Sequence, residues 1–144
     1  MSGSLRSHFD DYAAFHRTAG NQICHAIGIP VIVLSSLALL AQVPLVPVFG
    51  FTVTLAEVAI AVFASYFLIL DLRLGALMLA VYAVLDVVGR ALPPGPAAAL
   101  FGGGWVLQGV GHYVYEKNSP AFFRNFLHLA VGQLWILAKA TRRA

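Results

Sequence analysis

The chain has 144 residues, of which 60% are hydrophobic and only 10% are charged. Soluble domains contain about 45–50% apolar and about 25% charged residues, so this composition excludes an ordinary water-soluble globular fold and indicates a membrane protein. The 9 basic and 6 acidic residues give a formal net charge of +3. Because the basic residues lie mostly near the two ends and in short connections, we expect contact with anionic lipid headgroups and no nucleic-acid partner.

The first 22 residues contain acidic and aromatic side chains and lack the apolar core of a signal peptide. We expect an amphipathic helix at the membrane interface, with Phe9, Tyr12 and Phe15 pointing into lipid.

Four apolar runs follow, each long enough to cross a hydrocarbon core of about 30 Å. They cover residues 23–43, 51–70, 74–92 and 97–115. Pro44 and Pro47 limit helix continuation after the first run, and the sequence PPGP at 93–96 interrupts the chain before the fourth. The glycines of the fourth run favour close approach between helices. The last segment, 122–138, carries several polar residues, so we expect it to lie against the helices or at the interface.

These patterns predict an all-α fold, a polytopic membrane helical bundle that occupies residues 1–144 as a single integral membrane domain. We expect about four transmembrane helices that alternate in direction, with amphipathic N- and C-terminal helices. If the basic N-terminus is cytoplasmic, the connection at Arg73 and the segment 117–124 are cytoplasmic as well.

One group of charges lies toward the opposite membrane face. Asp86 and Arg90 are four residues apart and predict an ion pair, which Glu57 on the neighbouring helix can share. A structural charge cluster and a path for protons or ligands are both open for these residues.

Three polar residues of the fourth run are spaced by four and project from one helical face. These are Gln108, His112 and Glu116. Because an unpaired polar group in an apolar setting costs a few kcal/mol, this stripe requires protein partners, water or a metal ion. A hydrogen-bonded seam between helices remains the alternative.

The second polar segment is HRTAGNQICHAIGIP, which contains His16 and His25. Nine residues on a straight helix turn through about 900°, so these two side chains cannot converge on one unbroken helix. Gly20 and Asn21 indicate a helix stop followed by an N-cap, and such a break would let His16 fold back beside His25. Since the topology puts His112 at the same membrane face, we expect a shared site.

Histidines, a carboxylate and water suit Fe(II), Mn(II) or Zn(II), and an open position beside such ligands is typical of non-heme iron oxygenases. His128 is a candidate fourth histidine ligand. Two other functions fit the same residues. One is a non-catalytic lipid-binding or scaffold protein whose polar stripe only packs helices, and the other is a zinc-dependent membrane hydrolase.

The two polar segments together form the pattern H-x4-N-x3-H-x2-G-I-P followed by Q-x2-G-H-x3-E-x3-P-A. This pattern resembles the family of small membrane proteins typified by the yeast 2-hydroxy fatty acid dioxygenase, and the resemblance covers essentially the whole chain. The short loops and small size resemble bacterial members. The resemblance therefore implies an integral protein of a bacterial inner membrane, and the topology places its metal site near the cytoplasmic face.

The resemblance implies an Fe(II)-dependent dioxygenase that uses O2 to shorten a 2-hydroxy fatty acid by one carbon, with release of CO2. His16, His25 and His112 resemble the metal-site histidines of the family, and Glu116 and Asn21 are the next polar candidates. A 2-hydroxy acid could chelate iron through its carboxylate and hydroxyl oxygens while its alkyl chain lies in an apolar groove between helices.

We expect two amide side chains next to the metal ligands of this site. Gln108 or Asn21 could hydrogen-bond to a metal ligand or to the substrate carboxylate.

Overall fold

The computed structural model of the protein describes residues 3–120 and 127–142. Apart from one hairpin, the regular elements in these ranges are helical, as the composition predicts. In chain order they are α1 (Gly3–Ala14), α2 (Ala19–Leu40), β1 (Pro44–Val48), β2 (Phe51–Thr54), α3 (Leu55–Leu70), α4 (Leu72–Arg90), α5 (Pro94–Gly109), the π-helix η1 (Val110–Glu116) and α6 (Leu127–Ala140).

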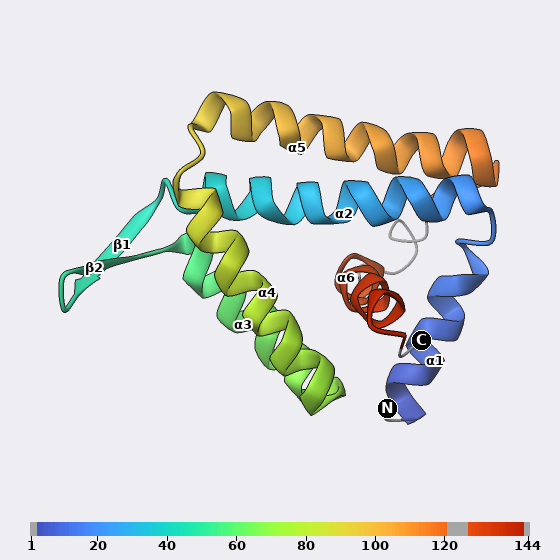
Figure 1. The fold of residues 1–144 in the computed structure, drawn as a ribbon, viewed down its shortest axis with the longest axis horizontal. Helices are drawn as coiled ribbons and strands as arrows, with labels where there is room; N and C mark the ends of the chain where they lie inside the picture. The colour runs from blue at the N-terminus through green and yellow to red at the C-terminus, as the bar shows by residue number, and fades with distance from the viewer. Residues whose placement is uncertain (1–2, 121–126, 143–144) are drawn as a thin grey trace.

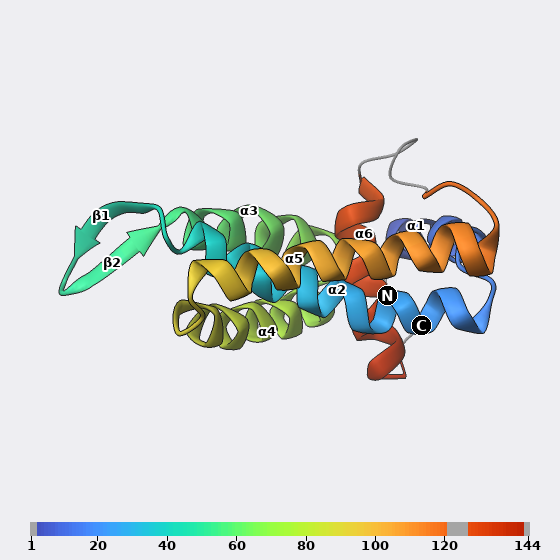
Figure 2. The same ribbon diagram turned by 90° about the horizontal axis from the view of Figure 1, so that it is seen from above.

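The helices are arranged as crossing pairs. Figure 1 shows α2 and α5 side by side along the length of the molecule, with α3 and α4 leaving one end of α2 obliquely as a second pair. Seen from above, α6 runs across α2 and α5, close to α1 (Figure 2). The helices α2 to α5 alternate in direction, as predicted, but the two pairs cross obliquely and do not form one simple up-and-down bundle (Figure 1).

Within residues 3–120 and 127–142, two helices are long and apolar enough to cross a membrane by length and composition, α2 with 22 residues and α4 with 19. The predicted span at 51–70 begins with strand β2, which leaves α3 only 16 residues. The predicted span at 97–115 is divided between α5 and η1. Two of the four predicted spans are thus confirmed as candidates, and the other two are shorter or interrupted.

The connection between α2 and α3 is an antiparallel hairpin, which the sequence analysis did not predict. Its turn places Phe49 and Gly50 at positive φ, 47° and 82°, a conformation that glycine adopts without strain. Strand β1 is exposed along its whole length, and the hairpin projects beyond the helices (Figure 1). Pro44 and Pro47 do end the helical run, but the chain continues as paired strands.

The predicted break between the first two histidines exists, but it lies nearer the N-terminus than Gly20 and Asn21. Helix α1 ends at Ala14 and α2 begins at Ala19. The N-cap is Thr18, whose hydroxyl accepts a hydrogen bond from the backbone N–H of Asn21.

Helix α1 packs against α6 inside the protein. Phe9 and Tyr12 are buried in a core with Leu134 and Trp135 of α6, while Phe15 is half-buried. The prediction that these aromatic rings point into lipid is wrong for Phe9 and Tyr12, because α6 covers that face of α1. This packing fixes the end of α1, where His16 follows.

Glycines bring α2 close to the α5–η1 segment. A Cβ atom at Gly104 would lie 2.6 Å from Ile32, and one at Gly28 would overlap the side chain of Gln108. The predicted close approach is confirmed at Gly104 and Gly111, whereas within the described part of the chain no atom lies near a Cβ built at 102, 103 or 109.

The predicted charge cluster is present at the end of α4. Arg90 Nε donates to Asp86 Oδ2 at 3.0 Å, and Arg90 also forms an ion pair with Glu57. The guanidinium lies 4.6 Å from the ring centroid of Phe51. This cluster joins α3, α4 and the hairpin.

Candidate metal centre

Three buried histidines from separate elements meet at one place. His16 lies between α1 and α2, His25 is on α2 and His112 is on η1, and their exposed fractions are 2%, 3% and 3%. One nitrogen of each ring lies within 4.8 Å of those of the other two. The structure thus brings the histidines of the two polar segments together.

The break after α1 turns His16 toward α2. The ring of His16 stacks on Tyr12 with centroids 3.9 Å apart, and its Nδ1 lies 2.7 Å from the backbone carbonyl of Tyr12. Tyr12 precedes His16 by four positions, so this one residue contacts the histidine through both its ring and its backbone carbonyl. This role of Tyr12 was not predicted from the sequence, although the spacing of four residues was a signal for it.

The hydrogen bonds of two rings select their tautomers. His25 Nδ1 lies 2.9 Å from the carbonyl oxygen of Asn21, and His16 Nδ1 has its carbonyl partner at Tyr12. Because a carbonyl oxygen only accepts, Nδ1 must carry the proton in both rings, which leaves the lone pair on Nε2 for a ligand.

Unsatisfied nitrogens make the centre suited to a cation. His16 Nε2 and His112 Nδ1 are buried and have no hydrogen-bond partner among the described residues. The three ring centroids lie 4.4 to 4.9 Å apart, with ring planes steeply inclined to one another. Unpaired buried nitrogens cost free energy that a bound metal ion would recover, so this donor set fits a metal.

Burial keeps His16 neutral. Loss of solvent lowers the pKa of His16 from 6.5 to about 3, although the hydrogen bond to the Tyr12 carbonyl acts in the opposite direction. Neutral imidazole is the form that binds metals, so His16 is in its ligating state at neutral pH.

Glu116 follows His112 by four residues, but its carboxylate binds groups at the start of α2. Its carboxylate accepts hydrogen bonds from the backbone N–H groups of Arg17 and Thr18, the Thr18 hydroxyl and the Asn21 amide. Burial alone would raise the pKa of Glu116, but these four hydrogen bonds outweigh it and lower the pKa to about 2. Glu116 thus ties the end of η1 to the first turn of α2.

The two predicted amides lie on either side of the histidines. Asn21 donates to the carbonyl of Phe15 and to Glu116, which holds the break between α1 and α2 closed. Gln108 is buried and lines an apolar cavity, and its Nε2 has no hydrogen-bond partner within residues 3–120 and 127–142.

His128 does not join the three-histidine cluster. Its Nε2 lies 2.7 Å from Asp11 Oδ2, so this nitrogen already has a partner on α1.

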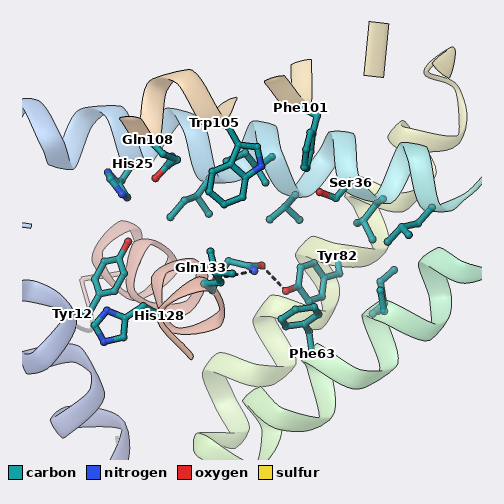
Figure 3. A pocket seen from close by; sticks show the side chains of 18 of the residues that line it. Tyr12, His25, Ser36, Phe63, Tyr82, Phe101, Trp105, Gln108, His128 and Gln133 are labelled. Carbon is teal, nitrogen blue, oxygen red and sulfur yellow. Dashed lines mark hydrogen bonds between the residues drawn. The ribbon is translucent and has the colours of Figure 1, made fainter. Parts of the chain in front are cut away.

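An apolar cavity of about 250 Å³ begins at the histidines and continues beneath α2. On α2 its lining runs from His25 to Leu40, which is about 22 Å at 1.5 Å per residue. Figure 3 shows Trp105 and Phe101 on one side, Tyr82 and Phe63 on the other, and His25 with Gln108 toward one end. The Tyr82 hydroxyl donates to Gln133 across this space at 2.6 Å.

The fold and the site together define a class: an apolar helical protein with a three-histidine centre at the end of a long hydrophobic cavity. The chain belongs to the Mpo1-like family, described as 2-hydroxy-palmitic acid dioxygenase Mpo1-like, whose model matches residues 2–144. This confirms the resemblance found in the two polar segments.

One curated relative matches over most of the chain. The protein is 29% identical over 127 residues to 2-hydroxy-palmitic acid dioxygenase MPO1 of Saccharomyces cerevisiae. The aligned region covers 88% of this chain and 73% of the yeast protein. No solved structure matches the chain.

Proposed function

We propose that this protein is a non-heme Fe(II)-dependent dioxygenase of 2-hydroxy fatty acids. The observation that carries the proposal is the group of three buried histidines, with unpaired ring nitrogens, at the end of an apolar cavity. The similarity to the yeast 2-hydroxy-palmitic acid dioxygenase supports the reaction and the substrate class. In this reaction a 2-hydroxy acid and O2 give an acid one carbon shorter, CO2 and water.

His16, His25 and His112 would hold the metal. Fe(II), when bound, supplies the redox chemistry toward O2 and coordination sites for the substrate oxygens. The backbone carbonyls of Tyr12 and Asn21 orient the first two rings, and Glu116 keeps the segments that carry all three together. Three protein ligands leave positions open for a chelating substrate.

The cavity would bind the hydrocarbon chain. One leaflet of a bilayer is about 15 Å of hydrocarbon, so a groove of about 22 Å along α2 can enclose a long acyl chain. Gln108 lies beside this groove with a buried, unpaired Nε2. We assign it the role of donating a hydrogen bond to the carboxylate or hydroxyl of the substrate, which leaves the polar head at the histidines.

We further propose that α2 and α4 anchor the protein in a bacterial inner membrane, in contact with lipids from which the substrate enters. The support is their length and apolar composition. The basic residues Arg6 and Arg17 flank the histidine end of the chain, which favours a cytoplasmic position for this end.

Metal analysis combined with oxygen consumption tests the proposal. Detergent-purified protein should contain about one iron per chain and consume O2 with 2-hydroxypalmitate. His25→Ala and His112→Ala should each lose the metal and the activity, whereas His8→Ala, on α1 and outside the cluster, should keep both. Iron-loaded, folded protein that consumes no O2 with 2-hydroxy acids of any chain length would contradict the proposal.

A further inference from the structure

His128 uses only one of its two ring nitrogens. The ring is buried and lines the cavity. Its Nε2 lies 2.7 Å from Asp11 Oδ2, whereas its Nδ1 is buried without a hydrogen-bond partner in the described parts of the chain. The Asp11 side chain is 56% exposed to solvent. One residue pair therefore reaches from the lining of the cavity to the surface.

The carboxylate defines the resting tautomer of this histidine. An ionised Asp11 only accepts, so Nε2 carries the proton and Nδ1 presents a lone pair. The other groups in contact with the ring are Tyr12, at 5.7 Å between ring centroids, and Phe15, at 5.8 Å. Asp11 and Tyr12, both on α1, are thus two titratable groups that contact His128. Burial raises the pKa of Tyr12, which keeps its hydroxyl protonated.

We propose that His128 and Asp11 form a proton path between the cavity and solvent. The inference rests on the proposed function. A proton that leaves the substrate hydroxyl would be taken by Nδ1 of His128, while the proton on Nε2 passes to Asp11 Oδ2 and then to water. When water forms from O2, a proton returns from solvent through Asp11 and His128 to the cavity. The pair therefore ends each reaction cycle in its starting protonation state.

The geometry separates this role from metal binding. His128 lies outside the cluster of three histidines, and the nitrogen that faces Asp11 is already engaged. A purely structural ion pair between α1 and α6 would need only Nε2. The orphaned Nδ1 on a residue that lines the cavity is the feature that a structural pair leaves unexplained.

Kinetics of matched variants test the path. His128→Gln and Asp11→Asn should retain iron and fold, but kcat should fall at least tenfold while KM stays unchanged. Exogenous imidazole should restore part of the activity of His128→Ala. Asp10→Asn, an exposed neighbour on α1, should behave as the wild type. Folded, iron-loaded His128→Gln with unchanged kcat would overturn the proposal.

A second readout does not depend on turnover. Nitrogen NMR of metal-free, full-length protein should show His128 with the proton on Nε2, and Asp11→Asn should shift this resonance and abolish the preference. A proton on Nδ1 in the wild type would overturn the path even if the enzyme is active. Wild-type protein that binds iron but consumes no O2 would instead contradict the proposed function, and the tautomer would still decide whether the pair is built as inferred.

Discussion

Glu116 and Thr18 lie 98 residues apart, yet a single carboxylate oxygen of Glu116 accepts hydrogen bonds from both the backbone N–H and the hydroxyl of Thr18, at 3.1 and 2.9 Å. Thr18 is the N-cap of α2, where a negative charge also interacts favourably with the helix dipole. Through this contact, the end of η1 that follows His112 is held against the break that separates His16 from His25.

Removal of this carboxylate should loosen the metal site without removing a ligand. We expect Glu116→Ala to weaken metal affinity about 10- to 100-fold, as for other residues that orient metal ligands. Glu116→Gln should fall between this variant and the wild type because its amide retains one acceptor oxygen. Calorimetric metal titration measures the change, with Val114→Ala, an exposed position on η1, as the control. Unchanged affinity in folded Glu116→Ala would show that Glu116 does not position the histidines.

Gly111 is needed because α2 and η1 touch beside the histidines. A Cβ atom there would lie 2.5 Å from Asn21 Oδ1 and 3.2 Å from His25 Nδ1. Gly111→Ala should therefore destabilise the fold by about 1–3 kcal/mol and reduce metal binding. Gly109→Ala is the matched control, since no described atom lies within 4 Å of its Cβ position. Equal unfolding midpoints for the two variants would contradict this packing.

The metal-free protein should lose stability in acid. The pKa of His16 is lowered from 6.5 to about 3 by burial, so its contribution is fully present above pH 6.5 and is lost as the pH falls toward 3. Protonation of Glu116 causes a second loss of stability as the pH falls from 4.5 to about 2, because its pKa is lowered in the folded state. The unfolded chain binds more protons in both windows, which makes stability rise with pH there.

His16→Asn should weaken the pH dependence of the free energy of unfolding between pH 6.5 and 4.5. Of the two groups, His16 and Glu116, only His16 contributes in this range. Denaturant unfolding at a series of pH values measures this slope, which is at most about 1.4 kcal/mol per pH unit for one proton. An unchanged slope in the variant would mean that His16 takes up its proton in the folded state.

A bulky side chain at the far end of the cavity should change substrate length. Ile60 of α3 lines the cavity, whereas Val62 on the same helix is 64% exposed. We expect Ile60→Trp to shift kcat/KM toward shorter 2-hydroxy acids by at least tenfold, and Val62→Trp to leave the preference unchanged. If both variants keep the wild-type chain-length profile, the alkyl chain does not lie in this cavity.

The convergence of the histidines could be predicted because depth in an apolar chain follows from counting residues along each helix. The break between His16 and His25 was also predictable from turn residues, although Thr18 and not Asn21 forms the cap. Both Thr18 and Asn21 are favoured cap residues, and the hydrogen bonds of Thr18 to Glu116, a partner far away in sequence, cannot be read from local propensity.

The crossing of the helices and the hairpin could not be predicted in the same way. Hydropathy measures how apolar a segment is but not which face another helix covers, so Tyr12 was assigned to lipid although α6 buries it. Residues 43–48 read as a proline-interrupted connection and residues 51–54 as the start of a span, whereas their pairing depends on the turn at Phe49 and Gly50.

The π-helical turn has a consequence for comparing relatives of this protein. Segment η1 closes wider hydrogen-bonded rings than an α-helix does, with i→i+5 bonds in place of i→i+4. Deleting one residue between His112 and Glu116 would regularise the backbone while preserving every histidine and the apolar character of the segment. A sequence with such a deletion would align well and still misplace the carboxylate, so the length of this turn distinguishes relatives that keep the Glu116 contact from those that lose it.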